Sequence, residues 1–106
     1  MASSRQYLDY VLDQLSGLDG VSSRAMMGEF ILYCQGKAVG GIYDDRLLVK
    51  PTASAARLLP HAQLERPYAG AKAMLLVDAV DDRKLLCELM PAVAGELPWP
   101  KRKKGV

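Results

Sequence analysis

The sequence predicts an α+β domain in which helices cover one face of an antiparallel sheet of about five strands. Apolar residues recur every three or four positions near the start, follow short strands in the middle, and return to helical spacing near the end. The strands come in runs and do not alternate with helices, which favours a two-layer α+β fold over a doubly wound parallel sheet. The 106 residues, half of them hydrophobic, suit a single core.

The first element is a helix over about residues 4–17. Ser3 or Ser4 can cap it, because a serine hydroxyl accepts a hydrogen bond from a free backbone N–H of the first turn. Gly17 and Gly20 mark its end. Its apolar face consists of Tyr7, Leu8, Val11, Leu12, Leu15 and Leu18.

Strands are expected next, over residues 24–27, 30–34, 37–43 and 46–50. Gln35-Gly36 and Asp44-Asp45 are turn signals, and links this short require the last three strands to be antiparallel. Gly40-Gly41 indicates a bulge or close packing against a helix. Met26 and Met27 point to opposite faces of a strand, so we expect one in the core and the other exposed or at an interface.

The second half predicts two more helices and two short strands. Pro51 opens a helix that ends at Pro60, and residues 63–66 and 73–77 are candidate strands. The last helix starts at Asp81 or Asp82 and carries a leucine face. Pro91 should kink or end this helix, and the chain from Gly95 onward should be extended.

The charge of the chain is unevenly distributed. Four of its 14 Lys and Arg residues lie at positions 101–104, and the remaining ten stand against 12 Asp and Glu residues. We therefore expect one mildly acidic domain over residues 1–100 and a basic tail over 101–106. No apolar run approaches the length of a membrane span, no signal sequence opens the chain, and two cysteines fit a reducing compartment. These features predict a cytoplasmic protein that does not contact a membrane.

The residues that carry enzyme chemistry do not form a recognisable set. His61, Cys34 and Cys87 have no metal-ligand spacing, and no serine lies in a nucleophile elbow. The pairs Asp44-Asp45 and Asp81-Asp82 fit turns and helix caps better than acid–base catalysis. We therefore expect no enzyme activity, no metal and no cofactor.

Several short motifs, taken in order, resemble the amino-terminal domain of the TfoX/Sxy family. The chain looks like a single-domain bacterial member, with Met27 where the wider family prefers phenylalanine, which we interpret as a conservative core exchange. The resemblance implies a fold like that of secretion-chaperone-type domains, no catalytic residues, and a regulatory or protein-binding module related to regulators of DNA-uptake competence. The motifs are residues 24–33, Gly36-Lys37, residues 41–45, residues 47–50, Pro67-Tyr68-x-Gly70-Ala71-Lys72 and Pro98-x-Pro100-Lys101.

Arg24, Lys50, Tyr68 and Lys72 form the candidate partner-binding site. They lie at strand ends and in a loop, where binding groups concentrate, and together they suit an acidic or phosphorylated ligand. The alternative is that Arg24 forms an internal ion pair with Glu29 or Asp45 and that Tyr68 only covers the core.

Three classes of function remain open on sequence grounds. A protein-binding regulator is favoured, and a homodimer through the sheet or a helix is compatible with it, since Tyr33, Tyr43 and the methionines could leave an apolar patch exposed. Nucleic-acid binding is the second class, and a small-molecule-binding domain the third. The basic residues for nucleic acid would be Arg24, Arg46, Lys50 and the Lys101–Lys104 tail.

Overall fold

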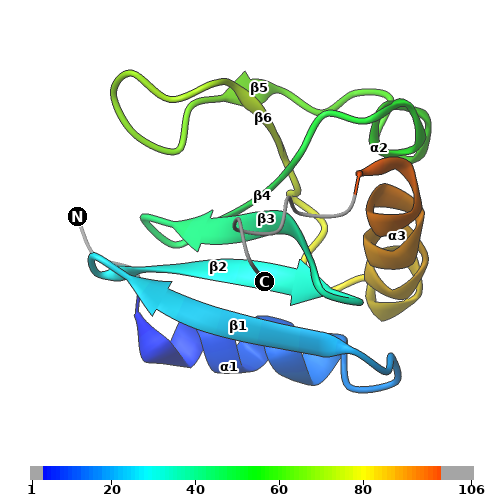
Figure 1. Cartoon of the computed structure of the whole chain (residues 1–106), viewed down its shortest axis with the longest axis horizontal. Helices are drawn as coiled ribbons and strands as arrows, with labels where there is room; N and C mark the ends of the chain where they lie inside the picture. The colour runs from blue at the N-terminus through cyan, green and yellow to red at the C-terminus, as the bar shows by residue number, and fades with distance from the viewer. Residues whose placement is uncertain (1–3, 99–106) are drawn as a thin grey trace, which may run out of the picture.

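A six-stranded antiparallel sheet and three helices make up the fold in the computed structural model, which describes residues 4–98 (Figure 1). The strands lie in the order β1-β2-β3-β4-β6-β5, and every neighbouring pair is antiparallel. The α+β class is confirmed, with six strands where about five were expected. In chain order the elements are α1 (Arg5–Gln14), β1 (Val21–Met26), β2 (Glu29–Cys34), β3 (Lys37–Tyr43), β4 (Arg46–Val49), α2 (Ala53–Leu58), β5 (Leu64–Glu65), β6 (Met74–Leu76) and α3 (Arg83–Glu96).

Tight two-residue turns join the first four strands. Both residues of each turn, Met27-Gly28, Gln35-Gly36 and Asp44-Asp45, have a positive φ between 53° and 86°. Such turns match the right-handed twist of paired strands. The turns expected at Gln35 and Asp44 are confirmed.

The expected placement of the two methionines is wrong. Met27 is a turn residue with 96% of its surface exposed, and Met26 at the end of β1 is 40% exposed. The strand ends one residue earlier than expected, because Met27 takes the left-handed conformation of the turn. The residue that replaces the family's phenylalanine is therefore a surface residue and not a core exchange.

A β-bulge interrupts the pairing of β2 with β3. Leu32 lies opposite Gly40 and Tyr33 lies opposite Ala38, so Val39 is the extra residue. A Cβ at Gly40 would lie 2.1 Å from the carbonyl oxygen of Leu48 on β4. The expected bulge is present. Gly40 is needed because the backbone of β4 approaches it closely, and not because a helix packs against it.

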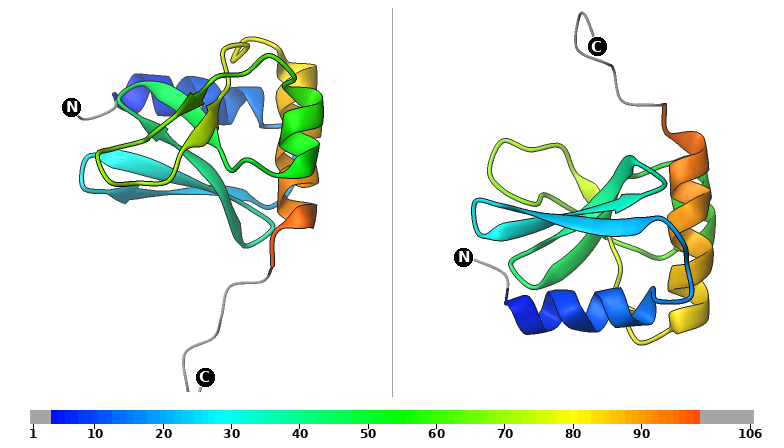
Figure 2. Two further views of the ribbon diagram at one scale, coloured as in Figure 1. Left: turned by 90° about the horizontal axis from the view of Figure 1, so that it is seen from above. Right: turned by 60° about the horizontal axis from the view of Figure 1, so that its bottom comes forward.

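The core lies on one face of the sheet. Alternate residues of the strands join buried residues of α1 and α3 in one hydrophobic cluster, while α2 packs on α3 (Figure 2). Burial of these side chains is the main force that holds the helices against the sheet. The members from the strands, with Val77 directly after β6, are Leu32, Cys34, Val39, Ile42, Leu47, Val49, Leu75 and Val77. The principal members from the helices, with Leu15 as the C-cap of α1, are Leu8, Val11, Leu15, Leu86, Leu89, Met90 and Val93.

Helix α3 passes through Pro91 and continues to Glu96, so the expected end at Pro91 is wrong, and the chain becomes extended at Leu97 and not at Gly95. Proline at position 91 removes the hydrogen bond to the Cys87 carbonyl, and its ring crowds that carbonyl, which disfavours the helix. The following turn is held by burial of Val93 and Ala94 in the core, and by Lys37 Nζ, which donates to the Ala94 carbonyl at 3.0 Å. The basic tail and most of the Pro98-x-Pro100 motif lie outside the described residues.

Candidate partner-binding groove

A groove of about 640 Å³ lies on the sheet face opposite the core. By strand register, Ile31 and Tyr43 point away from the helical layer and form part of its floor. The segment between β5 and β6 forms a wall, and Leu97 after α3 borders it. Its volume is within the range of ligand-binding clefts, and most lining side chains are apolar. The lining residues are Met26, Ile31, Ala38, Gly40, Tyr43, Lys50, Pro51, Thr52, Pro67, Tyr68, Ala71, Lys72, Ala73, Met74 and Leu97.

The guanidinium of Arg46 holds this wall to the sheet. Its Nη1 lies 2.6 Å from Oε1 of Glu65, and both side chains are 29% exposed. Nη2 donates to the carbonyls of Arg66 and Pro67 at 3.3 and 3.4 Å, and Nε donates to that of Tyr43 at 3.1 Å. The planar fork of arginine is suited to several such bonds at once. One β4 side chain therefore fixes where the 66–73 segment begins.

Two tyrosines meet at one end of the groove. The ring centroids of Tyr43 and Tyr68 lie 6.3 Å apart with a 58° tilt, a favourable edge-to-face type of contact. A Cβ at Gly41 would lie 2.6 Å from Cε2 of Tyr43, so this glycine leaves room for the ring. Burial raises the pKa of the Tyr43 phenol, and the neighbouring Tyr68, Glu29 and Tyr33 raise it further. Tyr43 therefore remains neutral at physiological pH.

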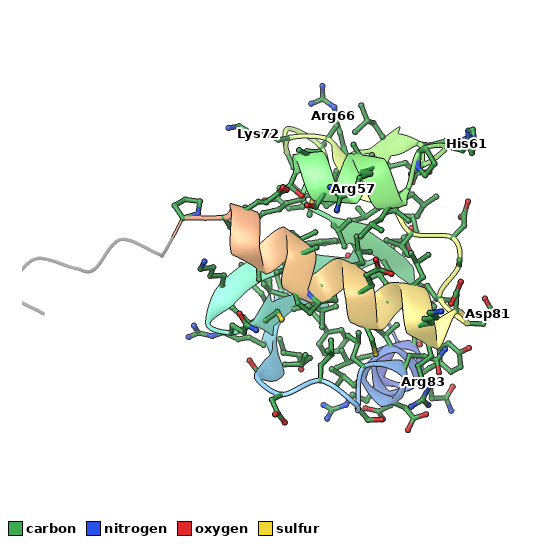
Figure 3. The ribbon with its side chains drawn as sticks, turned by 90° about the vertical axis from the view of Figure 1, so that its right-hand side faces the viewer. Arg57, His61, Arg66, Lys72, Asp81 and Arg83 are labelled. Carbon is green, nitrogen blue, oxygen red and sulfur yellow. The ribbon has the colours of Figure 1, made fainter. Side chains whose placement is uncertain are left out.

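The structure brings together three of the four residues that the sequence singled out, because Lys50, Tyr68 and Lys72 all line the groove. Arg24 does not line it, but lies on the same sheet face, directly opposite Ile31 of the floor. Arg24 is exposed, and it takes part in none of the ion pairs seen among residues 4–98, so the alternative of an internal pair is not supported. Figure 3 shows Lys72 extending from the 66–73 segment, far from Asp81 and Arg83.

The groove continues into an exposed apolar mouth formed by Met26 and Tyr68, with 40% and 59% of their surface exposed. Met27 follows at the hairpin tip. This tip, the 44–45 turn and the 66–73 segment lie at the same end of the molecule (Figures 1 and 2). Large side chains exposed together beside a groove are typical of interaction surfaces.

Sequence reasoning named Tyr43 and the methionines as a possible exposed apolar patch, but did not place them beside Lys50, Tyr68 and Lys72. Met26, Met74 and Leu97 come from three distant segments, and no local pattern shows that they meet.

Two other expectations concern charged and metal-binding groups. Arg46, a residue considered for nucleic-acid binding, shares the sheet face of Lys50 but is paired with Glu65. Within residues 4–98, no group of three or more His, Cys, Asp or Glu side chains could hold a metal ion.

Among residues 4–98, no helix has the length and apolar character that crossing a membrane requires.

The model of the TfoX N-terminal domain family matches residues 13–90. This chain belongs to that family. The matched range contains every residue that lines the groove except Leu97. An uncharacterized 12.7 kDa protein in the trpE 5′ region of Spirochaeta aurantia is 33% identical over 105 residues, which cover 98% of this chain and 91% of the relative. No solved structure matches the chain significantly.

Proposed function

We propose that this TfoX N-terminal domain is a non-enzymatic regulatory module that acts by binding another protein at the groove. The observation that carries the proposal is the continuity of the apolar groove with the exposed mouth at Met26 and Tyr68. Tyrosine is enriched among residues that dominate binding energy, and methionine adapts to varied surfaces. The relation of the family to competence regulators supports a regulatory role for the bound state.

Site-specific photo-crosslinking in the native cell tests this proposal. A photoreactive phenylalanine analogue replaces Tyr68 at the mouth or, as a matched control, Tyr10, which is 43% exposed on α1. We expect a defined protein adduct from position 68 and none of that mass from position 10. Equal labelling at both positions, or none at position 68, contradicts the proposal. An adduct of twice the chain mass identifies a second copy of this chain as the partner.

Nucleic acid remains the second candidate because Arg24, Lys50 and Lys72 share one face of the molecule. Affinity for DNA that rests on phosphate contacts falls steeply as salt increases. Retention on DNA at physiological salt, lost when Lys50 and Lys72 are changed to Glu, would favour this candidate. Retention lost only on deletion of residues 101–106 would assign it to the tail.

A further inference from the structure

The shape of the groove limits what can occupy it. It follows β3 from Tyr43 to Ala38, a distance of about 16 Å at about 3.3 Å per strand residue. A segment of about five residues in an extended conformation would span that length.

The charge of the groove selects among the segments that could bind there. Lys50 and Lys72 line it, and Arg24 stands beside its floor residue Ile31. None of the described residues that line the groove is acidic, and none of these three cations belongs to an ion pair seen within residues 4–98. Glu29 lies on the same sheet face, opposite Met26, and accepts a hydrogen bond from the backbone N–H of Asp44 at 3.2 Å. Cations over an apolar floor complement a segment that carries both carboxylates and apolar side chains. The chain's own basic residues 101–104 have the wrong sign for this site.

The wall that would contact such a segment is fixed in advance. Arg46 holds its start at Glu65, Arg66 and Pro67, and Arg66 Nη1 donates to the Ala71 carbonyl at 3.1 Å, which closes the loop on itself. A preformed wall loses little conformational entropy when a partner binds. The Tyr43–Tyr68 contact fixes the aromatic end in the same way.

From these observations we infer that the groove binds a short acidic segment of a partner protein, whose apolar side chains lie on the floor and whose carboxylates face Lys50, Lys72 and Arg24. The inference rests on the proposed function and specifies the chemistry of the partner. The mouth at Met26 and Tyr68 would hold the first apolar residue beyond the groove.

Selection from a phage-displayed library of random peptides on the immobilised full chain tests the inference. We expect enriched sequences that combine Asp or Glu with apolar residues. A synthetic peptide from this set should bind about tenfold more weakly to the Lys50→Glu, Lys72→Glu double variant, and more weakly at high salt. The double variant should itself select basic peptides. Arg5→Glu, Lys84→Glu, which makes the same change in net charge on α1 and α3, should bind the acidic peptide like the wild type.

The inference is overturned by enrichment without acidic residues, by no enrichment, or by an acidic peptide that binds both double variants equally. Self-association of the chain without peptide binding also overturns it. A crosslinked partner at position 68 together with any of these results leaves the proposed function standing and rejects only the acidic segment. Loss of both the adduct and the selection rejects both.

Discussion

Glu96, in the last turn of α3, accepts two hydrogen bonds of 2.8 Å from Ser54, one from its backbone N–H and one from its hydroxyl. Ser54 lies in the first turn of α2, whose N-cap is Thr52. A carboxylate at this position receives a free N–H of the helix and interacts favourably with its dipole. The ionised carboxylate of Glu96 therefore joins the end of α3 to the start of α2. Acid, which protonates this carboxylate, should weaken the contact between the two helices.

The first prediction concerns pH. Hydrogen bonds from the Ser54 backbone and hydroxyl hold the pKa of Glu96 below its ordinary value of 4.5, and Thr52 and Arg57 lower it further. Because the folded state favours the ionised form, this stabilisation is complete above the unfolded pKa and is lost as pH falls through the folded one. Glu96→Gln should lower Tm at pH 7, and the difference from wild type should shrink as pH falls below about 4.5. A constant difference between pH 7 and pH 3 would contradict this.

Thermal unfolding of Glu88→Gln provides the control for that series. Glu88 is exposed on the same helix, and its change to glutamine removes the same charge as Glu96→Gln. Its Tm should follow the wild type throughout.

The second prediction concerns the Arg46 contacts. Arg46→Met leaves the partly buried Glu65 carboxylate and three carbonyls without their donor, and should cost about 1–2 kcal/mol in urea unfolding. Arg46→Lys should not restore the loss, because one ammonium cannot reach the same set of acceptors. Arg5→Met, which removes an exposed pair with Asp9, should cost less than about 0.5 kcal/mol. Equal costs at positions 46 and 5 would show that Arg46 does not hold the wall.

The parts of the fold that the sequence predicted are those encoded locally. The α1 face, the Gln35-Gly36 turn and the Asp82 cap each depend on residues within a few positions, and all three are present. The first half of β1 was missed because this edge strand is almost fully exposed, so Val21-Ser22-Ser23 shows no apolar alternation. The predicted end of α3 came too early because the unfavourable effect of Pro91 on a helix is visible locally in the sequence. The contacts that extend the helix come from Lys37 and the core, which are distant in the sequence.

The candidate site was likewise predicted only where local patterns mark its residues. Lys50, Tyr68 and Lys72 were chosen as charged or aromatic groups beside turns, and they do lie together. The apolar floor and the role of Arg46 depend on how β4 faces the 66–73 segment, which no local pattern contains. Arg46 was instead considered for nucleic-acid binding, because its ion-pair partner Glu65 lies 19 positions away and no local pattern shows the pair.

The third prediction concerns Gly40. A methyl group there would lie 2.1 Å from the Leu48 carbonyl and 2.9 Å from Cα of Val49, both backbone atoms that cannot move without breaking the β3–β4 pairing. Gly40→Ala should therefore cost on the order of 3 kcal/mol or prevent folding. Gly95→Ala is the control, because nothing lies within 4 Å of its Cβ and the residue is helical. That change should add about 0.5–1 kcal/mol. A stable Gly40→Ala variant with an unchanged circular dichroism spectrum would contradict the close approach of β4.

The last prediction concerns Met27. Its φ of 53° is the left-handed conformation, which costs an ordinary side chain about 1–2 kcal/mol but suits asparagine and glycine at the first position of this type of turn. Because 96% of its surface is exposed, no packing is lost when it is replaced. Met27→Asn should therefore raise the free energy of unfolding by about 0.5–1 kcal/mol, measured by urea denaturation. Met90→Ala, at a core methionine that is 1% exposed, should lower it by about 2–5 kcal/mol. A loss of stability from Met27→Asn as large as that from Met90→Ala would show that Met27 is packed, and would contradict its exposure at the hairpin tip.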